Sequence, residues 1–157
     1  MSDSTYFQFE EDFVASLRCI PMAVRYKLDT CGIKLKLDQW HHFTRQERQA
    51  LVDRPCQDAT EAADYRQFLT TLIQARSQSQ AKTLPVEANP PWLNEAQIPE
   101  SLQQKARREG AHLDIHQWQV LTPLQRFALI KLSQPSHESH NFIPALQEFG
   151  LLEAKLP

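Results

Sequence analysis

An internal repeat constrains the fold of this chain more than any other feature of its sequence. When the 157 residues are shifted by about 78 positions, two long stretches come into register without a gap. Self-similarity at one fixed offset is typical of a duplicated structural unit. The matched positions include Ile20-Pro21 with Ile98-Pro99, Gly32 with Gly110, Trp40 with Trp118, Thr44 with Thr122, and Arg48 with Arg126.

The glycine and proline content favours helices over hairpins in both copies. The chain has three glycines, ten prolines and no Asn-Gly or Asp-Gly pair, so few tight β-turns can form. Helices joined by proline-containing loops satisfy this composition. We therefore predict a mostly α-helical fold built from two related helical halves.

Proline and glycine bracket the first helix of each copy. We place Pro21 and Pro99 at the first helical position, where the missing N–H is not needed. Gly32 and Gly110 lie about three turns later, where a left-handed residue ends a helix. The sequence therefore predicts one helix before each of these glycines.

Short alternating segments and capping motifs follow the first helices. Apolar and other residues alternate over 33–37 and 111–115, which predicts brief extended segments. Thr44 and Thr122 then stand three residues before Glu or Gln, a capping box that predicts a second helix in each copy. Paired buried tryptophans, Trp40 and Trp118, are expected at equivalent core positions.

The rest of the pattern predicts third helices, an N-terminal helix and one linker. Apolar periodicity places third helices near 59–75 and near 142–150, and an N-terminal helix from about Glu10. A polar, proline-rich stretch between the copies has no helical period. We predict a single domain, 1–157, with repeat halves of about 7–76 and 98–157 joined by a linker, 77–97.

Motifs for chemistry are absent from the sequence. There is no G-x-S-x-G, Walker loop or G-x-G-x-x-G, so we predict no catalytic residue and no cofactor. The cysteines lack C-x-x-C spacing, and we predict no metal site. One alternative stays open: a metal-binding or enzymatic protein with a composite site drawn from Cys19, Cys31, His41 and His42.

Net charge, hydropathy and cysteine content indicate which classes of partner and which cellular compartment fit this chain. Lysine and arginine total 17 against 19 acidic residues, a net charge of −2, which disfavours nucleic-acid binding. No apolar run approaches the ~18 residues that cross a bilayer, so we expect no membrane span. Three cysteines suit a reducing compartment, and we expect a cytoplasmic protein.

Two surface features are candidates for partner binding. Basic residues gather around the first helix and the segment after it: Arg18, Arg25, Lys34 and Lys36. They form either a solvated face or a docking patch for an acidic partner surface. Trp92, inside the predicted linker, is either an anchor for that linker or an exposed hot spot.

Several stretches resemble one known family. They are FQFEEDF at 7–13, LRCIPM at 17–22, KLD at 27–29 and CGIKL at 31–35. Together they resemble the nitrate reductase associated protein family of cyanobacteria, and the match is most specific over about residues 7–54.

The resemblance implies an accessory role in assimilatory nitrate reduction. Members of that family are implied to be cytoplasmic and to be needed for nitrate reductase activity, without being the reductase. That reductase carries a molybdenum pterin cofactor and an iron–sulfur cluster, and this chain has no cluster-type cysteine set. The resulting hypothesis is a non-catalytic protein that binds nitrate reductase and supports its maturation or activity.

Overall fold

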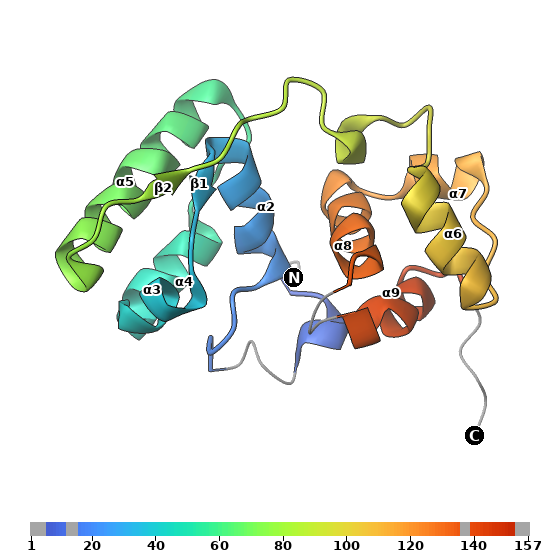
Figure 1. The fold of residues 1–157 in the computed structure, drawn as a ribbon, viewed down its shortest axis with the longest axis horizontal. Coiled ribbons are helices and arrows are strands. Elements are labelled where there is room, and N and C mark those ends of the chain that lie inside the picture. The colour runs from blue at the N-terminus through green and yellow to red at the C-terminus, as the bar shows by residue number, and fades with distance from the viewer. Residues whose placement is uncertain (1–5, 12–15, 136–138, 153–157) are drawn as a thin grey trace. The chain divides into compact units, whose positions relative to one another are not determined.

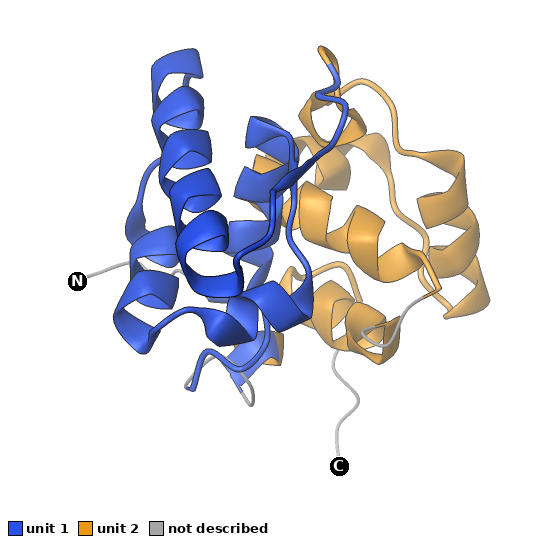
Figure 2. Ribbon diagram, turned by 60° about the vertical axis from the view of Figure 1, so that its left-hand side comes forward, with its two compact units in different colours: residues 1–6, 10–87 blue, residues 7–9, 88–157 orange. Residues whose placement is uncertain are grey.

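The computed structural model describes residues 6–11, 16–135 and 139–152 as a mostly helical protein (Figure 1). This confirms the predicted fold class. The chain divides into two compact units, coloured separately in Figure 2. Unit 1 comprises residues 1–6 and 10–87, and unit 2 comprises residues 7–9 and 88–157.

Unit 1 combines four helices with a small antiparallel ribbon among the described residues. Its elements are α2 (Met22–Cys31), β1 (Ile33–Lys34), α3 (Leu37–His42), α4 (Arg45–Asp53), α5 (Ala59–Ser77) and β2 (Lys82–Thr83). A 3₁₀ turn, Gln8–Glu10, precedes them in the chain, and only its last residue, Glu10, belongs to unit 1. The predicted N-terminal helix falls largely on residues 12–15, which lie outside the described residues.

Unit 2 contains helices and 3₁₀ turns in its described part. Its elements are a 3₁₀ turn (Pro91–Leu93), α6 (Glu100–Arg108), α7 (Ile115–Val120), α8 (Pro123–Ser133), a 3₁₀ turn (Ser139–Asn141) and α9 (Phe142–Glu148). The predicted third helices are therefore present as α5 in unit 1 and α9 in unit 2.

The glycine stops are confirmed, and the proline positions are corrected by one residue. Gly32 and Gly110 have φ of 78° and 83°, the left-handed values expected after α2 and α6. Pro21 and Pro99, however, precede the first helical residue, because their ψ angles of 157° and 136° keep them extended. In unit 1 the buried carboxylate of Glu10 accepts the Met22 N–H at 2.8 Å and supplies the missing cap.

The extended segments are shorter than predicted. Only Ile33–Lys34 forms a strand in the first copy, and residues 111–114 form none. Leu37 and Ile115, placed at the ends of those segments, instead begin the short helices α3 and α7. Three alternating apolar residues match a strand and the entry to a helix equally well, so the pattern alone did not separate them.

The partner of β1 comes from the predicted linker. Ile33 pairs with Thr83 and Lys34 with Lys82 in an antiparallel register, so β1 and β2 lie side by side (Figure 1). The stretch predicted as a linker, 77–97, therefore contains β2 and a 3₁₀ turn. The boundary between the units falls within that stretch, after Glu87.

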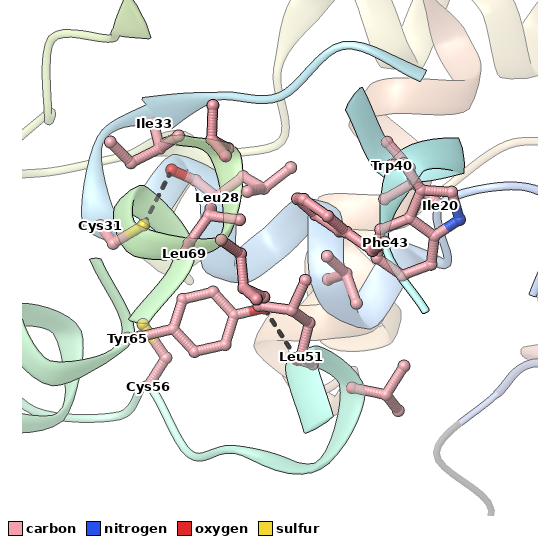
Figure 3. Close-up of a cluster of buried hydrophobic side chains, with 14 of the residues drawn as sticks. Ile20, Leu28, Cys31, Ile33, Trp40, Phe43, Leu51, Cys56, Tyr65 and Leu69 are labelled. Atoms are coloured by element: carbon pink, nitrogen blue, oxygen red, sulfur yellow. Dashed lines mark hydrogen bonds between the residues drawn. The ribbon is translucent and has the colours of Figure 1, made fainter. Parts of the chain in front are cut away.

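Each unit has its own apolar interior. In unit 1, the core in Figure 3 surrounds Tyr65, whose hydroxyl donates to the Leu51 carbonyl at 2.7 Å. Trp40 is 0% exposed there, and Trp118 is 1% exposed inside unit 2. Both tryptophans are core residues, as the repeat predicted. The other large buried side chains of unit 2 include Leu102, Phe127, Leu129, Phe142 and Leu146.

Candidate binding surface

The four predicted basic residues fall into two separate places in unit 1. Arg25 is half-buried, and its Nε donates to the Ile20 carbonyl at 3.0 Å, beside the N-terminal end of α2. Lys34 and Lys36 follow the C-terminal end of that helix. Ten residues of helix span about 15 Å, so α2 separates Arg18 and Arg25 from the two lysines.

A third lysine joins Lys34 and Lys36 through the ribbon. Lys82 lies directly opposite Lys34 in the β1–β2 register, and residues directly opposite one another share one face of a sheet. Lys36 lies two residues beyond Lys34 on backbone that is still extended, so it lies on that face as well. All three side chains are exposed, and we call Lys34, Lys36 and Lys82 the lysine face.

The acidic side chains of the described ranges leave the lysine face unpaired. Within the part of the chain that the structure describes, none of its three lysines forms an ion pair. Like charges directly opposite one another destabilise a sheet. The ribbon therefore carries a repulsion between Lys34 and Lys82 that the described residues leave uncompensated.

The other face of the ribbon borders a polar pocket of about 370 Å³. Arg66, Thr70 and Gln74 recur every four residues along α5 and form its helical wall. The remaining lining residues are Ile33, Gln80, Ala81 and Thr83. Arg66 Nη1 donates to the Cys31 carbonyl at 3.1 Å, so this guanidinium also holds the C-terminal end of α2.

The ribbon is fixed in place by its connections. Gln78 ends α5 with φ of 55°, and Ser79 accepts a hydrogen bond from the Gln39 amide at 3.3 Å. Leu84 N–H then donates to the Gly32 carbonyl at 2.8 Å. A Cβ on Gly32 would come within 2.8 Å of Val86 Cγ2, so the segment directly after β2 packs tightly against this glycine.

Trp92 belongs to unit 2, whereas the lysine face belongs to unit 1. It is half-buried, and its ring makes an edge contact with Phe127 at 5.0 Å between centroids. Its carbonyl accepts a hydrogen bond from Arg126 Nε at 2.6 Å. These contacts hold Trp92 against the core of unit 2, and its role as a hot spot for a partner stays a prediction.

The buried cysteines of unit 1 are core residues. Cys31 and Cys56 both lie in the apolar cluster of Figure 3, beside Tyr65. Burial raises the pKa of the Cys31 thiol and raises the pKa of Cys56 to about 11. Both thiols are therefore protonated near neutral pH, which makes them weak nucleophiles and weak metal ligands.

The histidines of the composite-site alternative are exposed and bonded to the backbone. His41 Nε2 lies 2.8 Å from the Arg18 carbonyl, and His42 Nδ1 lies 2.7 Å from the Asp38 carbonyl. Cys19 is half-buried. Among the described residues, no group of three or more His, Cys, Asp or Glu side chains is placed to hold a metal ion.

Sequence reasoning missed two parts of this surface. Lys82 was hidden in the predicted linker, and no local signal pairs it with Lys34. Arg66 was visible only as one polar residue on a helix that is mostly exposed on that side. The recurrence of Arg66, Thr70 and Gln74 at helical spacing was the available signal for the pocket wall.

Fold and surface together define a mostly α-helical protein with an exposed lysine face and a small polar pocket on one of two units. The chain belongs to the family of conserved nitrate reductase-associated proteins, whose model matches residues 6–149. This confirms the resemblance found in the sequence. No curated protein and no solved structure matches the chain. None of the helices in the described ranges has the length and apolar character that a membrane span requires.

Proposed function

We propose that the chain is an accessory protein that binds assimilatory nitrate reductase and supports its maturation or activity without catalysing a reaction itself. The observation that carries this proposal is the match of residues 6–149 to a family named for association with nitrate reductase. The lysine face supports a binding role, because exposed uncompensated charge steers association with surfaces of opposite charge.

The state of the buried nucleophiles supports the non-catalytic part of the proposal. Burial raises the pKa values of Cys31, Cys56 and Tyr65, so these groups stay protonated in the core of unit 1. Catalytic sites usually shift such pKa values toward the working pH instead. Lys27, whose pKa is lowered by burial, donates to the Val52 and Arg54 carbonyls at 2.6 Å and thereby caps the end of α4.

Direct association tests the partner assignment. The purified chain is mixed with purified nitrate reductase, once in its cofactor-free form and once cofactor-loaded, and complex formation is followed by size-exclusion chromatography with light scattering. We expect a complex with at least one form. Failure to associate with either form would remove nitrate reductase as the partner.

A second measurement separates assistance from catalysis. Cofactor-free reductase is reconstituted with and without the chain, and both the yield of active reductase and its turnover are recorded. We expect the chain to raise one of them while showing no nitrate turnover alone. Metal analysis of the same preparation serves as a control, because stoichiometric metal would favour the composite Cys/His alternative.

A further inference from the structure

We propose that the lysine face of unit 1 is a docking site for an acidic segment of a protein partner. The inference rests on the proposed function only in taking nitrate reductase as the source of that segment. The occupant is defined chemically, as a stretch of chain with several Asp or Glu carboxylates close together. The residues that bind it are Lys34, Lys36 and Lys82.

The first argument is the cross-strand repulsion. Lys34 and Lys82 lie opposite one another in a ribbon whose strands are two residues long each, so little backbone pairing opposes their repulsion. A carboxylate placed between the two ammonium groups would convert the repulsion into attraction. The described part of the chain therefore leaves a charge imbalance at the ribbon that an acidic partner corrects.

The second argument is that the fold does not require these lysines. In the sequence repeat, Lys34 corresponds to His112 and Lys36 to Asp114. Unit 2 forms the same glycine-ended helix followed by a short capped helix with those residues in place. Since one unit folds with an acidic residue where the other has lysine, the cationic character of unit 1 is not a requirement of the shared scaffold.

The third argument is the accessibility and support of the lysine face. Its three side chains are exposed, and the ribbon beneath them is held by the bond from Leu84 N–H to the Gly32 carbonyl. Ile33 on the opposite face is 1% exposed and anchors the ribbon in the core. The charges are therefore presented on a fixed support, which reduces the entropy lost on binding.

Binding of a defined acidic peptide tests the docking site without the reductase. The ¹⁵N-labelled full chain is titrated with hexaglutamate, and hexaglutamine serves as the neutral control probe. We expect backbone shift changes centred on residues 33–36 and 82–83 with hexaglutamate alone. The changes should weaken as salt is raised, because ions screen contacts between exposed charges.

Paired charge reversals provide matched variants. Lys34→Glu with Lys82→Glu should weaken hexaglutamate binding about tenfold or more, whereas Arg107→Glu with Arg108→Glu makes the same charge change on exposed residues of unit 2 and should leave it unchanged. If the first variant fails to fold, Lys34→Gln with Lys82→Gln removes the same charges without adding acidic ones.

The outcomes separate this inference from the proposed function. Shift changes centred on unit 2, or equal changes with hexaglutamine, would overturn the docking site. So would a reductase complex that the Lys34 and Lys82 reversals leave intact, although the proposed function would then stand. If the wild-type chain binds no reductase, the proposed function fails, and the peptide titration still decides whether the lysine face binds acidic segments.

Discussion

Each unit buries one tryptophan of the repeat and gives its indole N–H a carbonyl acceptor. In unit 1, Trp40 Nε1 donates to the Leu17 carbonyl at 2.8 Å. In unit 2, Trp118 Nε1 donates to the Asn94 carbonyl, also at 2.8 Å. Both acceptors lie in the segment that leads into the first helix of their unit, so each indole ties that segment to the core.

An arginine eight positions after each tryptophan repeats the arrangement. Arg48 donates to the Trp40 carbonyl at 3.1 Å, and Arg126 donates to the Trp118 carbonyl at 3.2 Å. Each guanidinium thereby satisfies carbonyls at the end of a six-residue helix, α3 or α7. The shared internal bonds are what a duplicated unit would retain, which supports the duplication that the sequence predicts.

The two units share the internal hydrogen bonds of their tryptophans and arginines, but their exposed elements differ. The last described helix has 19 residues in unit 1 (α5) and 7 in unit 2 (α9). The ribbon, the lysine face and the polar pocket are described for unit 1 and involve residues that follow α5. The interior bonds therefore maintain the fold in both units, whereas the binding role proposed for unit 1 rests on exposed residues of its ribbon.

Replacing Arg126 or Arg48 should show how much each arginine contributes to the free energy of unfolding. Arg126 is 2% exposed, and its Nη1 also donates to the Leu121 carbonyl at 2.7 Å. Arg126→Met should lower the free energy of unfolding by about 3–4 kcal/mol, because buried carbonyls lose their donors. Arg48→Met should cost about 1–2 kcal/mol, because water reaches the half-buried Arg48 site. Urea unfolding measures both; equal losses would contradict the role assigned to burial.

Alanine substitutions at Gly32 and Gly110 should separate the cost of a positive φ from the cost of steric contact with the added Cβ. Both positions have positive φ, which costs about 1–2 kcal/mol for a residue with a Cβ. A Cβ at Gly110 meets nothing within 4 Å, whereas one at Gly32 also meets the Leu84 carbonyl at 3.0 Å. Gly32→Ala should therefore cost about 1–2 kcal/mol more than Gly110→Ala. Thermal unfolding of the two variants tests this, and a larger loss at Gly110 would show that Leu84 and Val86 do not pack against Gly32 as described.

The two threonine caps should contribute equally. Thr44 Oγ1 accepts the Glu47 N–H and Thr122 Oγ1 accepts the Gln125 N–H, both at 3.1 Å. Thr44→Ala and Thr122→Ala should each lower stability by about 1 kcal/mol. Chemical denaturation with residue-resolved hydrogen exchange assigns each loss to α4 or α8. A loss in only one variant would mean that the two threonine hydrogen bonds contribute unequally to stability, although their lengths are the same.

The smallest expected effect is a loss in the free energy of unfolding at alkaline pH, caused by the buried thiols of unit 1. The Cys56 pKa, raised by burial from 9.0 to about 11, means that the unfolded chain loses this proton first. Stability is therefore lost between about pH 9 and 11. The raised pKa values of Cys31 and Tyr65 act in the same direction. Lys27 opposes them, because its lowered pKa makes its contribution rise with pH up to 10.5.

Cys56→Ala provides the measurement of that pH dependence. Urea unfolding of the wild-type chain and the variant is compared at pH 8 and pH 10.5. The wild-type chain should lose more stability over this interval, because the variant lacks one thiol that titrates differently in the two states. An identical loss in both chains would show that Cys56 is not buried from solvent in the folded protein.

Sequence reasoning succeeded where structure depends on neighbouring residues. The capping boxes at Thr44 and Thr122 and the stops at Gly32 and Gly110 all appear as predicted, because each depends on a few consecutive residues. Trp40 and Trp118 are also buried as predicted, at 0% and 1% exposed.

Features that join distant parts of the chain were not predictable in this way. The carboxylate of Glu10 caps a helix that starts at Met22, and Lys82 pairs with Lys34 across the whole of α5. Such contacts depend on the tertiary arrangement of distant segments, which local sequence patterns do not specify. For the same reason, the basic residues near α2 looked like one patch although the helix divides them.

The affinity of purified nitrate reductase for two charge-reversed chains tests the central claim most directly. The dissociation constant is measured by biolayer interferometry for the wild-type chain, for Lys34→Glu with Lys82→Glu, and for Arg107→Glu with Arg108→Glu. We expect the unit 1 reversal to weaken binding about tenfold or more, and the unit 2 reversal to leave the affinity near the wild-type value. The opposite order, or equal affinity for all three chains, would contradict the claim.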